Sequence, residues 1–166
     1  MRNEIAECLN RLRIQETLAR YSIAVDTGDV EGFASVFTDN GLWEWQAANL
    51  RFCGRFQLRR LAETVRTHAN GAQHAVFNSL VRIDGDSAHS FCQFTTFLSK
   101  PEQIYTLMLG YYEDKLAKIE DKWLISHRAV RVENLEILSQ GKIGEYFAPL
   151  ADALSKMPQT SDEPNR

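Results

Sequence analysis

Residues 73–99 read QHAVFNSLVRI-DGD-SAHSFCQFTTFLS, and this stretch indicates the class of fold. Strand-type residues flank Asp84-Gly85-Asp86 on both sides, and such a triplet is typical of the tight turn in a β-hairpin. Two further strand-type runs, at 104–119 and 123–133, are separated by the turn Glu120-Asp121-Lys122. The second half of the chain is therefore predicted to form a meander of long antiparallel strands.

The first third of the chain has the periodicity of helices. Apolar side chains recur there mostly at intervals of three and four residues, at Ile5, Cys8, Leu9, Leu12, Ile14, Leu18, Tyr21 and Val25. Gly28 is a natural end for this helix, and Asp29 is a natural N-cap for a short second helix. A strand is expected at 42–46 and a third helix at about 57–68. Helices followed by antiparallel strands predict an α+β fold, in which the helices pack on one face of a bent sheet.

The length and the composition restrict the class of protein. With 166 residues, 44% of them hydrophobic and 25% charged, the chain is typical of one globular domain, expected at 1–155 and followed by a disordered tail at 156–166. The formal net charge of −3 argues against a nucleic-acid partner. Met1-Arg2-Asn3-Glu4 leads into an amphipathic helix, and no apolar run reaches the roughly 20 residues that span a bilayer. A cytoplasmic protein with no membrane partner is therefore expected.

The cysteines and histidines form no recognisable metal-binding pattern. Cys8, Cys53 and Cys92 are far apart, and they make no zinc-type spacing with the four histidines. We therefore expect three unpaired thiols, no metal site and no cofactor.

Asp26 and His74 are the strongest candidates for chemistry. Asp26 falls in the last turn of the predicted first helix, where a carboxylate faces the negative end of the helix dipole. His74 opens the first strand of the hairpin. If the fold brings them together, the carboxylate orients the imidazole, and the pair forms a general base that needs no metal. The alternative is that His74 is a histidine of the core or the sheet edge, and that Asp26 is merely a residue at a helix end.

Other side chains are expected to line a pocket around this pair. The Tyr21 ring belongs to the buried helical stripe, and its hydroxyl must bond either a substrate oxygen or a backbone carbonyl. Trp43 and Trp45 lie at period two in a strand and are expected to form apolar walls that suit a cyclic substrate. Asn78 has the strand parity of His74, but at ~3.3 Å per residue it lies roughly 13 Å away and would touch only a large substrate.

The chain resembles the SnoaL-like branch of the nuclear transport factor 2 superfamily over most of residues 5–135. The resemblance rests on short motifs in the order of the family: Arg20-Tyr21…Asp26-Thr27-Gly28-Asp29, Phe37-Thr38-Asp39-Asn40-Gly41, Gly54, His74…Asn78, Asp84-Gly85-Asp86-Ser87-Ala88 and Lys122-Trp123-Leu124-Ile125. It implies a cone-shaped α+β domain, in which a curved antiparallel sheet wraps around the N-terminal helices and leaves a deep pocket at its open end.

Within this superfamily the chain is similar to the scytalone dehydratases, the bile-acid 7α-dehydratases and the hexachlorocyclohexane dehydrochlorinases, which are cofactor-free lyases. In these groups an aspartate of the first long helix pairs with a histidine that begins a central strand, and Asp26 and His74 match those positions. The bile-acid group also implies roles for Tyr21 and for Arg131 in the last long strand, although Arg131 could equally pair with a nearby glutamate at the surface.

The resemblance and the residues together predict a cofactor-independent lyase of the dehydratase type, acting on a hydrophobic cyclic small molecule. The expected catalytic residues are His74, Asp26 and Tyr21, and the expected substrate-binding residues are Asn78, Arg131, Trp43 and Trp45. Three alternatives stay open, and one of them is a non-catalytic protein that binds a small molecule. An isomerase or cyclase of a polyketide- or steroid-like substrate would use the same proton abstraction. Residues 128–134 also resemble the non-catalytic β subunits of aromatic-ring-hydroxylating dioxygenases. The family further implies a homo-oligomer, either a dimer or a trimer.

Overall fold

The computed structural model describes residues 2–69 and 71–160. In this part of the chain the helices are α1 (Arg2–Thr27), α2 (Val30–Ser35), α3 (Gly54–His68) and α4 (Gly141–Ser155), with short 3-10 helices η1 (Gln46–Ala48) and η2 (Leu135–Ser139). The strands are β1 (Phe37–Trp45), β2 (Leu50–Cys53), β3 (Ala72–Asp84), β4 (Ser87–Ser99), β5 (Ile104–Ile119) and β6 (Lys122–Val132).

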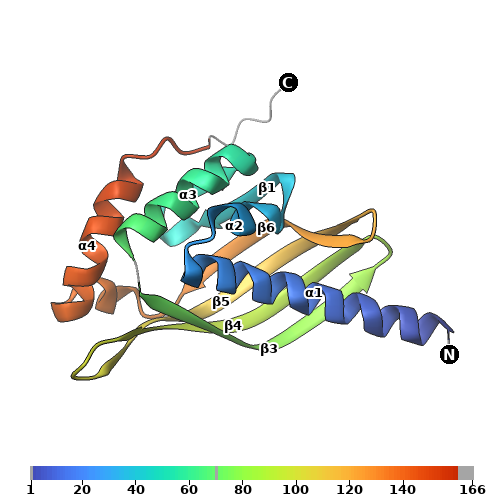
Figure 1. Ribbon diagram of the computed structural model, residues 1–166, viewed down its shortest axis with the longest axis horizontal. Helices are drawn as coiled ribbons and strands as arrows, with labels where there is room; N and C mark the ends of the chain where they lie inside the picture. The colour runs from blue at the N-terminus through green and yellow to red at the C-terminus, as the bar shows by residue number, and fades with distance from the viewer. Residues whose placement is uncertain (1, 70, 161–166) are drawn as a thin grey trace.

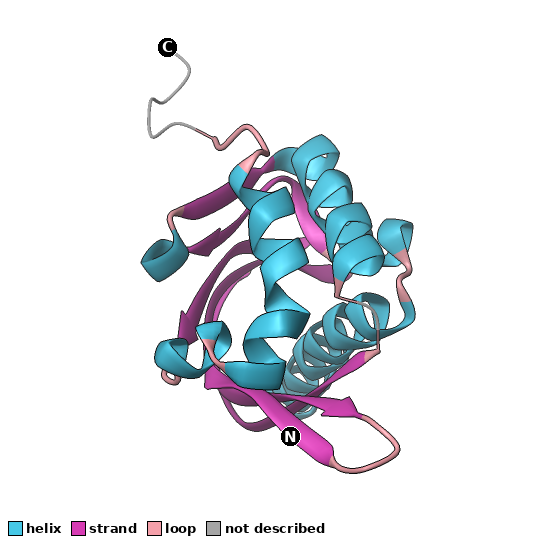
Figure 2. Cartoon of the chain, turned by 90° about the vertical axis from the view of Figure 1, so that its left-hand side faces the viewer, coloured by secondary structure: helices cyan, strands magenta, loops and turns pink. Residues whose placement is uncertain are grey.

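The strands form one curved sheet in the order β2-β1-β6-β5-β4-β3. The β1–β6 pair is parallel, whereas the other neighbouring pairs are antiparallel. Within the described residues the edge strands β2 and β3 do not pair with each other, so the sheet curls without closing. The helices lie on its concave side (Figures 1 and 2). The predicted α+β fold, with a curved sheet wrapped around N-terminal helices, is confirmed.

The inner face of α1 explains how the helix attaches to the sheet. Ile14, Leu18, Tyr21 and Ala24 recur at three- and four-residue intervals, and all four are buried. Ile5, Leu9 and Leu12 lie on the opposite face of the helix, and they are exposed where α1 extends past the sheet (Figure 1). Burial of the inner stripe fixes the C-terminal end of α1 beside α3 and β3, and this end carries Asp26.

Two β-bulges change which residues of a strand face the helices. In β3 the pairing with β4 shifts between Phe77 and Leu80, and Asn78 takes a positive φ of 52°. Between β5 and β6, Lys115 pairs with His127 but Leu116 pairs with Ile125, so Ser126 is an additional residue in β6. Because side chains alternate along a strand, one additional residue inverts the parity of everything beyond it.

Some boundaries differ from the sequence-based expectation. The third helix begins at Gly54 rather than near 57, and the strand expected at 42–46 is β1, which begins earlier, at Phe37. The start of the expected disordered tail is packed. Met157 is buried, and Thr160 exchanges backbone and side-chain hydrogen bonds with β2. The rest of that expected tail, residues 161–166, lies outside the described residues. None of the described helices is both long enough and apolar enough to cross a membrane.

Candidate functional site

A cavity of about 270 Å³ lies between the concave face of the sheet and the helices α1, α3 and α4. Its walls are mostly apolar, and they include Ala24, Leu61, Val65, Phe94, Leu107 and Phe147. The cavity is therefore suited to a small hydrophobic molecule, with a few polar groups to orient it. Asp26, His74, Tyr21, Trp43 and Trp45 all line this one cavity.

Asp26 and His74 are in direct contact. Asp26 Oδ1 lies 2.6 Å from His74 Nδ1, and Asp26 Oδ2 accepts a hydrogen bond of 2.8 Å from the backbone N–H of His74. The two side chains are mostly buried, with 20% of Asp26 and 10% of His74 exposed. An ionised carboxylate only accepts hydrogen bonds, so the neutral imidazole carries its proton on Nδ1 and presents an unprotonated Nε2. In this arrangement Nε2 is the ring nitrogen that can accept a proton.

The local sequence explains how Asp26 comes to face β3. Gly28 takes a positive φ of 70° and terminates α1, which leaves Asp26 in the last helical turn. A carboxylate at this end of a helix opposes the dipole. Two hydrogen bonds from His74 offset that unfavourable placement.

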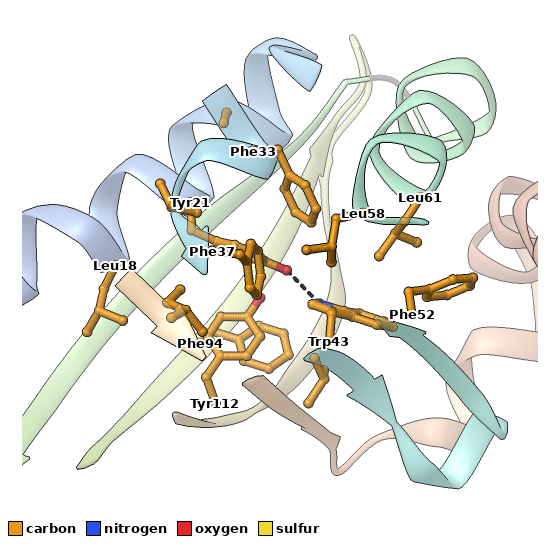
Figure 3. Close-up of a cluster of buried hydrophobic side chains, with 14 of the residues drawn as sticks. Leu18, Tyr21, Phe33, Phe37, Trp43, Phe52, Leu58, Leu61, Phe94 and Tyr112 are labelled. Atoms are coloured by element: carbon orange, nitrogen blue, oxygen red, sulfur yellow. Dashed lines mark hydrogen bonds between the residues drawn. The ribbon is translucent and has the colours of Figure 1, made fainter. Parts of the chain in front are cut away.

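Tyr21 is buried at the inner end of the cavity, and its oxygen accepts a hydrogen bond of 2.9 Å from Trp43 Nε1 (Figure 3). Its partner is thus a neighbouring indole rather than a backbone carbonyl. Burial raises the pKa of the Tyr21 hydroxyl, and the nearby Arg128 cation acts in the opposite direction. Tyr21 therefore stays protonated, with its own O–H proton available to donate.

A buried ion pair, which the sequence interpretation missed, lies beneath the tyrosines. Arg128 donates to Asp114 at 2.7 and 2.8 Å, and both side chains are at most 1% exposed. The guanidinium carbon of Arg128 lies 3.9 Å from the ring centroid of Tyr21 and 4.2 Å from that of Tyr112. Burial alone would lower the pKa of Arg128, but the Asp114 carboxylate reverses this effect and raises it. Arg128 is thus a fixed positive charge under the inner wall.

Two predicted substrate-binding residues lie elsewhere, and this corrects the expectation. Arg131 is 60% exposed and pairs with Glu113 on the outer face of the sheet. Asn78 is exposed and donates to Gln93 at 2.5 Å. The physical reason is a bulge in each strand. The bulge in β3 turns Asn78 away from the cavity, and the bulge in β6 turns Arg131 outward and Arg128 inward.

Tyr146 of α4 also lines the cavity, and its hydroxyl already makes a hydrogen bond within the protein. Its hydroxyl donates to the backbone oxygen of Ala69 at 2.6 Å, and burial raises its pKa to about 12. Among the residues that the structure describes, no group of three or more His, Cys, Asp or Glu side chains could hold a metal ion.

A curved sheet with a helix-covered apolar cavity and a carboxylate–imidazole pair at its wall defines a cone-fold domain that binds small molecules. Residues 6–129 match the model of the SnoaL-like domain, and the chain belongs to that family. This confirms the family that the sequence motifs indicated.

The chain is also similar to individual proteins in sequence and in fold. The uncharacterized protein Rv2910c of Mycobacterium tuberculosis is 29% identical over 128 residues, which cover 75% of this chain and 86% of that protein. The solved structure of Rv3472(D26N), a Mycobacterium tuberculosis protein of unknown function, has a TM-score of 0.83 and 26% identity, and covers 95% of this chain and 96% of its own. A proposed scytalone dehydratase from Novosphingobium aromaticivorans has a TM-score of 0.67 and 19% identity, with 76% and 86% covered, and this likeness shows the fold alone.

Proposed function

We propose that this protein is a cofactor-independent lyase of the dehydratase type, which uses His74 as a general base on a hydrophobic cyclic small molecule. The observation that carries the proposal is the hydrogen bond between Asp26 and His74 at the wall of an apolar cavity. A structural histidine would need only one partner and no access to a cavity. His74 has a carboxylate partner on Nδ1 and lines the cavity.

In the proposed reaction His74 Nε2 takes a proton from a carbon of the substrate. The electrons of that C–H bond form a new double bond, and a leaving hydroxyl departs with its electron pair. Tyr21 protonates the leaving oxygen, so that the products are an alkene and water, and the proton on His74 later restores Tyr21 through solvent. Asp26 stabilises the imidazolium that forms in between.

The isomerase or cyclase alternative begins with the same proton abstraction and differs in where the electrons go. In it the electrons of the C–H bond move onto a carbonyl oxygen, which Tyr21 stabilises by donating a hydrogen bond. The fixed positive charge of Arg128 lies under the Tyr21 ring and favours negative charge at that position in both reactions.

Hydrogen–deuterium exchange tests the shared step without knowledge of the natural substrate. Cyclic ketones of one to three rings, such as 1-tetralone, are incubated with the protein in D₂O, and exchange next to the carbonyl is followed by NMR. We expect the wild type to accelerate the exchange. In His74→Ala the rate of the catalysed exchange should be about 10²- to 10⁴-fold lower. His89→Ala is the matched control, because His89 is exposed on β4 and does not line the cavity.

An equal rate in His74→Ala and the wild type, or no acceleration by the wild type with any of the ketones, would contradict the proposal.

The rival function is that of a structural subunit, and purification separates the two. A β subunit of a ring-hydroxylating dioxygenase co-purifies with a larger iron–sulfur protein, whereas the proposed lyase forms a homo-oligomer by itself. Light scattering on the purified protein would give the order of that oligomer, a dimer or a trimer. The exposed apolar stripe of α1 at Ile5, Leu9 and Leu12 supports a self-associating protein.

A further inference from the structure

The inner wall of the cavity holds polar groups that the pairing of Asp26 with His74 does not use. Trp45 lines the cavity, and its Nε1 is buried and has no hydrogen-bond partner among the described residues. Tyr112 also lines the cavity and is 2% exposed. Burial raises the pKa of its hydroxyl well above the ordinary value, so the group stays protonated and can donate. A buried donor without a partner, such as Trp45 Nε1, is costly, so a ligand that accepts from it gains affinity.

Two more hydroxyl groups in the cavity wall each already accept one hydrogen bond from the protein. The Tyr21 oxygen accepts from Trp43, and Thr96 Oγ1 accepts from the backbone N–H of Met108 at 3.1 Å. Each of these hydroxyl groups therefore has one acceptor position filled and keeps its proton to donate to a ligand. The indole of Trp45 can only donate. The hydrogen-bonding capacity of the inner wall is biased toward donors.

The register of the sheet places Trp45 and Tyr112 on one face. Glu44 pairs with Ala129 and Val130 pairs with Tyr112, so Trp45, Val130 and Tyr112 follow one another across β1, β6 and β5. At 4.7–4.9 Å between neighbouring strands, the backbones of Trp45 and Tyr112 are about 10 Å apart. A molecule of two fused rings is long enough to extend from one donor toward the other.

The aromatic rings between the base and Tyr112 set the orientation of such a molecule. The Tyr112 ring stacks on Phe94 with 4.2 Å between centroids, and the centroid of Phe94 lies 6.5 Å from that of His74. Tyr112 on β5 and His74 on β3 lie on opposite sides of Phe94, because β4 runs between these two strands. A flat ligand packed against Phe94 would present one edge to His74 and another to the donors.

We propose that Trp45 Nε1 and the Tyr112 hydroxyl bind acceptor oxygens of the ligand, so that the cavity selects neutral cyclic compounds with carbonyl-type oxygens over hydrocarbons and amines. The inference rests on the proposed function in that it concerns the same cavity. It assigns the two residues to recognition of oxygen, whereas proton abstraction belongs to His74. An amine would bring more donors to a wall that already carries them.

Equilibrium binding measured by titration calorimetry tests this with three matched bicyclic probes: 1-tetralone, tetralin and 1-aminotetralin. They differ only in a carbonyl, a methylene or an ammonium group. We expect 1-tetralone to bind more tightly than the other two. Because 1-tetralone carries one oxygen, Trp45→Phe or Tyr112→Phe, whichever removes the donor that this oxygen uses, should reduce the ratio of tetralone to tetralin affinity by between about 2-fold and 10-fold, the effect of one neutral hydrogen bond. Because tetralin fills the same space, the ratio removes the effect of altered volume.

Tyr111→Phe is the matched control, because Tyr111 stacks on Phe91 outside the cavity. Its ratio should equal that of the wild type. Equal affinities of the wild type for 1-tetralone and tetralin would overturn the proposal, as would a ratio that both cavity variants leave unchanged. His74→Ala should keep the preference for 1-tetralone, so a failure of the proposed catalysis is distinguishable from a failure of this inference.

Discussion

Asp26 holds His74 by both of its carboxylate oxygens, one on the ring nitrogen Nδ1 at 2.6 Å and the other on the backbone N–H at 2.8 Å. The second hydrogen bond fixes which oxygen faces the ring, because the backbone N–H can only donate. Position and protonation of the imidazole are therefore set by one side chain.

Replacement of Asp26 by Asn should separate these two effects. The amide oxygen of Asp26→Asn would accept from the backbone N–H, which leaves the amide NH₂ facing Nδ1. That group donates, so the neutral imidazole would carry its proton on Nε2 and lose its function as a base. We expect an unchanged fold, a reversed tautomer in the ¹⁵N NMR spectrum of His74, and a loss of about 10² to 10⁴ in ketone exchange.

Asp29→Asn is the control for this change. Asp29 caps α2 by accepting from the Gly32 N–H at 2.9 Å, and Asn is an equally good N-cap. The tautomer argument fails if Asp26→Asn retains a proton on Nδ1, or if it exchanges the ketone at the wild-type rate.

A second prediction concerns the buried pair of Arg128 and Asp114. Arg128→Met leaves the Asp114 carboxylate buried without its partner, so we expect the free energy of unfolding to fall by about 3 to 5 kcal/mol. Arg131→Met, on the same strand but in an exposed pair, should change it little. Urea unfolding of both variants provides the comparison, and similar losses in the two would contradict the assignment of Arg128 as a buried structural charge.

The sequence was sufficient for the fold because periodicity and turn residues decide element type locally. The hairpin turn at Asp84-Gly85-Asp86 and the stripe of Ile14, Leu18, Tyr21 and Val25 needed no knowledge of tertiary structure. The contact of Asp26 with His74 was anticipated from their positions at element ends and from the family motifs, and the structure brings the two side chains together.

Which side chains of the long strands face the cavity could not be predicted from the sequence pattern in this way. Period-two counting assumes an unbroken strand, whereas Ser126 interrupts β6 and Asn78 interrupts β3. Counting across Ser126 places Arg131 inside and Arg128 outside, which is the reverse of the structure. A bulge depends on how two strands pair, so a single strand carries only a weak signal for it.

A third prediction concerns the buried thiol of Cys92 and the dependence of protein stability on pH. Burial raises the pKa of Cys92 from 9.0 to about 11, so the folded protein keeps this proton after the unfolded chain has lost it. The free energy of unfolding is thus unaffected by Cys92 below about pH 9. It should fall as the pH rises from 9 to 11, by at most about 1.4 kcal/mol per pH unit. Tyr21 and Tyr112, whose pKa values are also raised, add to this loss at higher pH.

Urea unfolding between pH 8 and 11 measures that slope. Cys92→Ala should lower it over this range, whatever its effect on stability at pH 8, whereas exposed Cys8→Ala should leave it unchanged. Alkylation provides a second readout, since a buried thiol with a raised pKa reacts slowly. Identical slopes in the wild type and Cys92→Ala, or equal alkylation of Cys92 and Cys8 in the folded protein, would contradict the prediction.

The last prediction concerns how α4 closes the cavity. The hydroxyl of Tyr146 donates to the backbone oxygen of Ala69, just beyond α3, and the α4 residues Phe147, Leu150 and Leu154 line the same cavity. Tyr146→Phe keeps the ring but removes the donor, which should cost about 1 kcal/mol and loosen α4 on α3. We expect faster amide exchange confined to α4 and the end of α3, and faster association and dissociation of 1-tetralone, with little change in exchange for β4 and β5. Tyr111→Phe on β5 is the control, because Tyr111 stacks on Phe91 away from α4. Equal amide exchange in α4 for Tyr146→Phe and the wild type would show that packing alone, without this hydrogen bond, holds the helix over the cavity.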